Sequence, residues 1–200
     1  MRITTGQYKG RVLKMPNGIR PTQDKVRKAL FDILGDIEGL SFLELFAGSG
    51  AVGFEAISRG VSDLTMVEYN RDCLRAIQKN IESLEARACS VYPQEAEKAI
   101  KSLHKEKRKF DIIFLDPPYY LGLTPRLRSG SMVSAAEPLS KKTLQTLEAY
   151  DILAPNGFIV VQHFKKDTLL EKIGNLAIFR QAKYGDTKLS FYRKVNPKSQ

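Results

Sequence analysis

From Ser41 onward, short apolar runs alternate with stretches whose apolar residues recur about every three or four positions. The short runs are typical of buried strands, and the longer spacing is typical of amphipathic helices. The pattern predicts strands at 42–46, 64–67, 88–91, 110–115 and 158–162, with helices at 51–58, 72–84, 95–103 and 143–153. Alternating strands and helices form βαβ units, so we expect a mainly parallel α/β sheet with helices on both faces.

Both ends of the chain depart from this alternation. Near the N-terminus, β-prone residues 2–5 and 11–14 flank a segment bounded by Gly6 and Gly10, which predicts a small hairpin. Thr22 then caps a predicted helix, because apolar residues follow it at helical spacing. Near the C-terminus, strands at 177–181 and 187–193 flank Gly185-Asp186, which predicts that the sheet ends in an antiparallel hairpin.

The length of 200 residues fits one domain, which we divide into an N-terminal hairpin and helix extension at 1–35 and a core at 36–200. No apolar stretch approaches the ~20 residues of a membrane span, and the N-terminus lacks an apolar signal, so we expect a cytoplasmic protein without membrane contact. Cys73 and Cys89 are widely separated and have no histidine at metal-binding spacing. We therefore expect no metal site.

The net charge of +10 is concentrated near the N-terminus. Between Met1 and Leu30, basic residues outnumber the one acidic residue, Asp24, by seven. Basic clusters gain affinity for phosphates by releasing counterions, which points to a nucleic-acid partner. Charge alone does not separate RNA from DNA or acidic lipid, and a solvated basic face is the alternative. The residues expected to contact nucleic acid are Lys9, Arg11, Lys25, Arg27 and Lys28.

A glycine-rich turn follows the first predicted strand of the core. Gly48 and Gly50 lack a Cβ where a cofactor would approach the backbone, and Gly53 permits close helix–strand packing. Glu68 ends the next strand, twenty positions after Gly48, where a carboxylate can accept hydrogen bonds from ribose hydroxyls. Nicotinamide, flavin and S-adenosylmethionine enzymes all use such turns. A tight turn without a ligand and a glutamate that is only a surface charge are the alternatives.

Asp116-Pro117-Pro118-Tyr119 follows the apolar strand at 110–115. Two prolines fix a rigid extended turn, and the carboxyl end of a parallel strand is where ligands bind in such sheets. Asp116 and the carbonyl of Pro117 are acceptors suited to the two N–H bonds of an exocyclic amine, and Tyr119 offers a flat face for a base. The basic stretch from Leu121 to Lys142 is predicted to be a loop, either a substrate lid or an insertion without a role.

Together, Arg20-Pro21-Thr22, the glycine turn, Glu68 and Asp116-Pro117-Pro118-Tyr119 resemble the bacterial 16S rRNA guanine-N2 methyltransferases of the RsmD family over nearly the whole chain. The resemblance implies a class I methyltransferase fold, a Rossmann-like seven-stranded sheet whose last strand is antiparallel. It implies S-adenosylmethionine as donor and a guanine N2 in 16S rRNA of the small ribosomal subunit as acceptor. The cofactor contacts it implies are Arg20, Thr22, Glu44, Phe46, Gly48, Gly50, Glu68 and Asp116, with Glu95 near the adenine.

The sequence departs from the family at two positions and in one stretch, because Leu121 to Lys142 is longer and more basic than the family pattern. Gln162 stands where members often have a glutamate, and Glu95 stands where a polar Asp or Asn often contacts the adenine. Three other functions remain open. The first is a DNA adenine methyltransferase, because the two acceptors at Asp116 and Pro117 also suit the N6 amine of adenine. The second is a nicotinamide oxidoreductase, which the glycine pattern alone would fit. The third is a catalytically silent RNA-binding assembly factor, which would also be basic.

Overall fold

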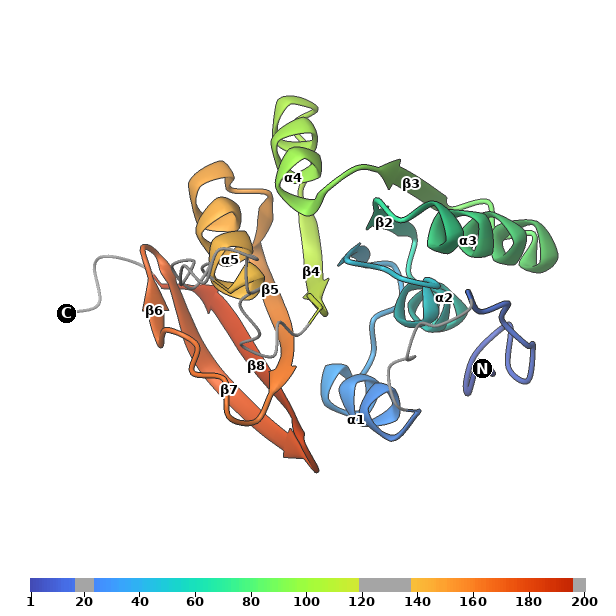
Figure 1. Ribbon diagram of the computed structural model, residues 1–200, viewed down its shortest axis with the longest axis horizontal. Coiled ribbons are helices and arrows are strands. Elements are labelled where there is room, and N and C mark those ends of the chain that lie inside the picture. The colour runs from blue at the N-terminus through green and yellow to red at the C-terminus, as the bar shows by residue number, and fades with distance from the viewer. Residues whose placement is uncertain (17–23, 119–137, 196–200) are drawn as a thin grey trace, which may run out of the picture.

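The computed structural model describes residues 1–16, 24–118 and 138–195. Its centre is an eight-stranded sheet in the order β3-β2-β1-β4-β5-β8-β7-β6 (Figure 1). The parallel strands are β1 (Ser41–Leu45), β2 (Asp63–Glu68), β3 (Cys89–Pro93), β4 (Phe110–Leu115) and β5 (Leu153–Phe164). The helices between them are α2 (Ala51–Ser58), α3 (Arg71–Leu84), α4 (Ala96–Lys105) and α5 (Leu139–Tyr150). Within these ranges, every helix is too short or too polar to cross a membrane.

The strand order reverses at β1. β2 and β3 lie on one side of this strand, whereas β4 and β5 lie on the other. Such a reversal opens a crevice at the carboxyl ends of the two central strands, because the connections leave them in opposite directions. The glycine turn follows the carboxyl end of β1, and Asp116 follows that of β4. The topology therefore brings the two main sequence motifs to the same edge of the sheet.

The C-terminal part of the sheet is antiparallel, as predicted. β8 (Thr187–Lys194) lies between β5 and β7 (Leu176–Tyr184) and is antiparallel to both. Gly185, at φ +61°, provides the left-handed residue of the predicted two-residue turn. The sheet has eight strands rather than seven because β6 (Lys172–Ile173) pairs with the start of β7. Two residues are too few to show a strand periodicity.

The largest differences from the predicted boundaries of the core are at the starts of α5 and β5. α5 begins at Leu139, so the end of the predicted 121–142 loop is helical, and residues 121–137 lie outside the described part of the chain. Residues 155–157, which the sequence places before the strand at 158–162 as a turn at Pro155-Asn156-Gly157, lie inside β5, where the pairing with β4 shifts register between Phe110 and Ile112. A Cβ on Gly157 would lie 2.9 Å from the carbonyl oxygens of Phe110 and Asp111. The glycine therefore marks a bulge against β4, not the start of a strand.

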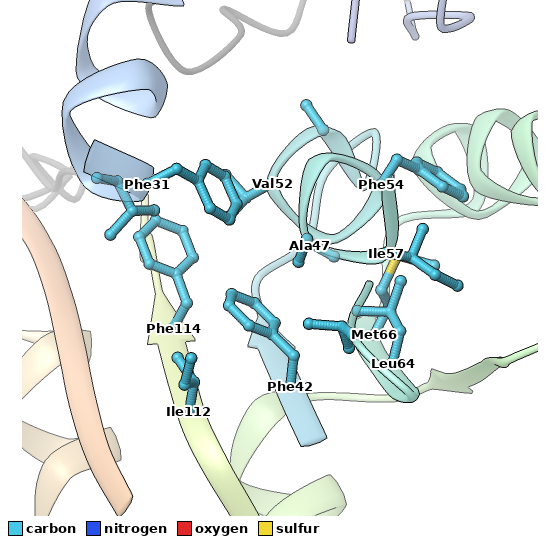
Figure 2. Close-up of a cluster of buried hydrophobic side chains, with 14 of the residues drawn as sticks. Phe31, Phe42, Ala47, Val52, Phe54, Ile57, Leu64, Met66, Ile112 and Phe114 are labelled. Atoms are coloured by element: carbon cyan, nitrogen blue, oxygen red, sulfur yellow. The ribbon is translucent and has the colours of Figure 1, made fainter. Parts of the chain in front are cut away.

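Each face of the sheet packs against its own helices. On one face, Phe42, Ile112 and Phe114 pack with α2 and with Phe31 of α1 (Asp24–Leu34), as Figure 2 shows. On the opposite face, α4 and α5 bury Ile113 and its neighbours. The central strands are buried on both faces, which explains why they read as continuous apolar runs in the sequence.

The N-terminal segment 1–16 packs against α2. It contains one isolated antiparallel bridge, between Arg2 and Val12, so the predicted hairpin is shorter than expected. A Cβ on Gly6 would come within 1.6 Å of the Ser58 carbonyl oxygen, so only glycine fits this approach to α2. The N–H of Gln7 donates to the same carbonyl at 2.8 Å. Close backbone contact with α2, and not a long strand pair, therefore fixes the position of Gly6 and Gln7.

Candidate active site

Three acidic side chains meet at the carboxyl ends of β2, β1 and β4. In the strand register, Glu44 on β1 pairs with Met66 on β2 and with Phe114 on β4. Glu68 and Asp116 lie two residues beyond these partners, so the alternation of side chains along a strand brings all three to one face. The charges of Asp116 and Glu68 both raise the pKa of Glu44. The three carboxyl groups are therefore close enough to interact.

Every second residue of the glycine turn, from 46 to 50, has a backbone conformation in the left-handed region. Phe46 has φ +61°, Gly48 φ +57° and Gly50 φ +75°. A non-glycine residue adopts this conformation at a cost of about 1–3 kcal/mol, and such residues concentrate at ligand sites. A Cβ on Gly48 would meet nothing within 4 Å, whereas one on Gly50 would lie 2.7 Å from Phe54 and 2.8 Å from the sulfur of Met66. Gly48 thus exposes open backbone, and Gly50 is required by the packing of α2.

Glu44 holds the start of α2 against β1. Its Oε2 accepts a hydrogen bond from the N–H of Gly53 at 2.9 Å, and a Cβ on Gly53 would lie 2.7 Å from the same oxygen. Gly53 is therefore needed for close helix–strand packing, as predicted. Burial raises the pKa of Glu44 to about 8; the charges of Asp116 and Glu68 add to this, while the amides of Gly53 and Val52 oppose it. Most of the Glu44 carboxyl groups are consequently protonated at neutral pH.

Glu68 is fixed by three backbone amides. Its Oε2 accepts from Gly48 at 2.7 Å, and its Oε1 accepts from Tyr69 at 2.9 Å and Asn70 at 2.8 Å. The strand end and the glycine turn are thereby joined through one buried carboxylate. Tyr69, with an exposed fraction of 63%, lies directly beside it and was not singled out from the sequence. The available signal was an aromatic residue immediately after an acidic strand end.

Asp116 receives a hydrogen bond from Gln162. Its Oδ2 accepts from the Gln162 Nε2 at 2.7 Å, because the register of β4 with β5 brings the two residues level. The Gln162 side chain is buried, and its Oε1 accepts no hydrogen bond from the described residues. Pro117 is buried and Pro118 is exposed. Tyr119, predicted to stack on a base, lies outside the described residues.

Of the three remaining predicted cofactor contacts, the structure describes Glu95. Glu95 precedes α4, at the same edge of the sheet, and its exposed carboxylate pairs with Lys98 at 3.2 Å. Arg20 and Thr22 lie outside the described residues. Their contacts with a cofactor stay predictions.

Four of the five residues predicted to bind nucleic acid are exposed, but Arg27 is not. Its exposed fraction is 1%, and its guanidinium donates to the Arg2 carbonyl at 2.6 Å and lies 3.7 Å from the Glu55 carboxylate. The prediction that Arg27 contacts a phosphate is therefore wrong, because its guanidinium is buried and lies against the Arg2 carbonyl and the Glu55 carboxylate. The exposed members are Lys9, Arg11, Lys25 and Lys28.

The described residues contain no group of three His, Cys, Asp or Glu side chains placed to hold a metal ion. Cys73 and Cys89 are free thiols. Burial raises the pKa of Cys73 to about 11 and that of Cys89 to about 12. Both sulfur atoms are therefore protonated at neutral pH, the form that does not ligate metals.

The sheet order, the antiparallel β8 beside β5 and the glycine turn at the reversal define a Rossmann-like class I methyltransferase fold. Among solved structures, yhhF from Escherichia coli matches with a TM-score of 0.76 and 28% identity, over 97% of each chain. The 16S rRNA N2-guanine methyltransferase RsmC of Thermus thermophilus, in complex with AdoMet and guanosine, matches with a TM-score of 0.64. This match has 22% identity and covers 90% of this chain and 44% of the other, so it supports the fold alone.

The chain belongs to the family described as conserved hypothetical protein 95, whose model matches residues 1–193. YlbH of Bacillus subtilis is 35% identical over 97% of this chain and 99% of its own length. Ribosomal RNA small subunit methyltransferase D of Escherichia coli K12 is 30% identical over 97% of this chain and 90% of its own length. The resemblance to the RsmD family, based on the sequence motifs, is confirmed.

Proposed function

We propose that this protein uses S-adenosylmethionine to methylate the exocyclic N2 amine of a guanine in 16S rRNA, within a particle of the small ribosomal subunit. The observation that carries the proposal is the pairing of Asp116 with Gln162 at the carboxyl end of β4, beside the glycine turn of β1. The Escherichia coli relative is named for methylation of small-subunit rRNA, and RsmC for methylation of guanine N2.

The glycine turn and Glu68 fit S-adenosylmethionine. Gly48 leaves its backbone open to a ligand, and Phe46 shapes the turn around it. The Oε2 of Glu68 accepts a hydrogen bond from one backbone amide, that of Gly48, so it keeps a lone pair that can accept another from a ribose hydroxyl. The exposed ring of Tyr69 offers a flat face for the adenine. When bound, S-adenosylmethionine supplies a methyl group activated by its sulfonium.

Asp116 and Pro117 hold the acceptor amine. The carboxylate of Asp116 and the carbonyl of Pro117 accept its two N–H bonds, and the prolines keep these acceptors in place. Gln162 fixes the orientation of the carboxylate through its hydrogen bond. The nitrogen lone pair then points at the methyl carbon, and the rate comes mainly from this positioning. As the methyl carbon passes from sulfur to the amine, the nitrogen would gain positive charge and its bond to Asp116 would strengthen. The nitrogen would then lose one proton to water, with the cofactor left as the neutral thioether.

The relatives weigh against the other functions that the sequence left open. Asp116 could also accept a hydrogen bond from the N6 amine of adenine in DNA, but the curated relatives include enzymes named for rRNA methylation. A nicotinamide oxidoreductase shares the glycine pattern, but the sheet has the methyltransferase arrangement. A silent assembly factor would bind RNA without transferring a methyl group.

The test is methyl transfer from labelled S-adenosylmethionine to small ribosomal particles from cells that lack this protein, followed by nucleoside mass spectrometry. We expect labelled N2-methylguanosine, with much less product from the Asp116→Ala variant. A parallel reaction on naked 16S rRNA tests the particle requirement. Labelled N6-methyladenosine, or no label in any substrate, would contradict the proposal.

A further inference from the structure

The antiparallel end of the sheet carries a cluster of aromatic and cationic side chains. Phe158 of β5, Phe179 of β7 and Phe191 of β8 have ring centroids 6.1 to 6.4 Å apart. The guanidinium of Arg193 lies 5.2 Å from the centroid of Phe179, and that of Arg180 lies 5.9 Å from the centroid of Phe191. We call these five residues the aromatic–arginine face.

A bulge in β7 produces the exposed position of this face. Ile178 pairs with Tyr192 and Arg180 pairs with Phe191, so Phe179 is the extra residue between two ladder pairs. Bulges re-aim side chains and are common beside functional sites. Phe179 has an exposed fraction of 45%, although its ring contacts those of Phe158 and Phe191. The backbone irregularity thus presents a ring to solvent.

The face lies on the side of the sheet opposite α5. Tyr192 and Ile178 point toward the core that α4 and α5 cover, whereas Phe191 and Phe158 belong to the core on the other side. The contacts of Phe179 with Phe158 and Phe191 place it on that other side, where nearly half of its side chain remains exposed to solvent (45%). In Figure 1, β7 and β8 lie in the antiparallel end of the sheet, and β4 and β5 separate them from β1. The face is therefore separate from the candidate active site.

The charge of the hairpin favours a polyanion. Residues 176–194 contain five basic residues and one acidic residue. The acidic residue, Asp186, is paired with Lys165 at 2.6 Å. Of the three rings, Phe191 is buried (1%) and Phe158 is half-buried, so Phe179 is the ring that is exposed to solvent. Exposed aromatic rings beside cations are typical of surfaces that stack single-stranded bases. Arginine also contacts phosphates and the planar faces of bases.

We propose that the aromatic–arginine face docks a single-stranded stretch of the substrate RNA, with a base stacked on Phe179 and with Arg180 and Arg193 near the adjoining phosphates. This proposal rests on the proposed function, because it makes the docked RNA the substrate of the methyl transfer. RNA is favoured over a protein partner because the exposed ring lies among cations on a strongly basic hairpin.

A fluorescent reporter tests the stacking directly. The sequence has no tryptophan, so Phe179→Trp introduces a single indole, and Leu170→Trp is the control at another exposed position (47%) outside the face. We expect a single-stranded RNA oligonucleotide of mixed sequence to quench the indole at position 179, and inorganic polyphosphate, which has charge but no bases, to leave it unquenched. Absence of quenching by RNA, or equal quenching at both positions, would overturn the proposal.

A binding measurement separates this proposal from the proposed function. Phe179→Ala is expected to raise the dissociation constant for small-subunit rRNA by about 5-fold to 150-fold, the range for one base–aromatic stack. Phe179→Leu, which keeps apolar bulk without a flat ring, should show a similar loss. Cofactor affinity and kcat at saturating RNA should stay at wild-type values. Methyl transfer with unchanged rRNA affinity in both variants would refute the docking face alone, whereas stacking without any wild-type methyl transfer would refute the proposed function alone.

Discussion

At the scale of single residues, Asp116 is the group on which the proposed chemistry depends most. Asp116→Ala is expected to lower kcat by roughly 10²–10³-fold, the loss typical of one preorganised charge-stabilising group. The cofactor dissociation constant should stay within a few-fold of wild type. Asp116→Asn keeps an acceptor oxygen without the charge, so its turnover should lie between that of wild type and that of Asp116→Ala. Single-turnover kinetics and calorimetry check these values, and wild-type turnover of the alanine variant would remove Asp116 from the reaction.

Gln162 should act on the reaction only through Asp116. Gln162→Leu keeps a similar volume but removes the hydrogen bond to the Asp116 Oδ2. We expect kcat to fall by about 10-fold, equivalent to ~1.4 kcal/mol of lost orientation, with little change in cofactor affinity. In an Asp116→Ala background the same substitution should have almost no further effect. Equal losses in both backgrounds would mean that Gln162 has a separate role.

Glu44 should make the stability depend on pH. Its pKa is raised from 4.5 to about 8 in the folded protein, so the folded state binds an extra proton between these values. This contribution to the free energy of unfolding is fully present below pH 4.5 and is lost as the pH rises through about 8. Urea denaturation should show wild type losing a few kcal/mol relative to Glu44→Gln as the pH rises through that window. Parallel pH profiles for the two proteins would contradict the prediction.

At the scale of elements, a buried ion pair joins α1, α2 and the N-terminal segment. The Glu55 carboxylate accepts from Thr4 through its N–H at 2.8 Å and its hydroxyl at 2.6 Å, and Arg27 lies beside it. The Arg59 guanidinium lies 3.2 Å from the same carboxylate, so Arg27→Met leaves Glu55 partly compensated. The same substitution leaves the Arg2 carbonyl without its donor. We therefore expect a loss of ~1–3 kcal/mol in the free energy of unfolding. Lys28→Met, one position along on the exposed side of α1, should change it by no more than ~0.5 kcal/mol. Similar denaturation midpoints for both variants would contradict the structural role of Arg27.

At the scale of the whole molecule, the distribution of charge should govern RNA affinity. Lys9 and Arg11 are exposed on the N-terminal segment. Replacing both with alanine should flatten the slope of log affinity against log salt by up to ~2 phosphate-equivalents. Lys105 and Lys107, exposed at the end of α4, are the matched control and should leave the slope unchanged. If the first pair also leaves it unchanged, those residues only solvate the surface.

The sequence by itself determined the features that depend on neighbouring residues. The parallel core, the glycine turn and the rigid segment at Asp116 follow from hydrophobic periodicity and from the restricted backbone angles of glycine and proline. The C-terminal hairpin was readable for the same reason, because Gly185 supplies the positive φ that its turn requires.

Only the tertiary structure decided which distant residues meet. Arg27 read as a surface cation because its helix is basic, and packing against Glu55 turned it inward. The register of β4 with β5 brings Gln162 to Asp116. The bulge in β7 exposes Phe179 to solvent. A shift of one residue in register exchanges the two faces of a strand, and no local pattern records which strand lies beside which.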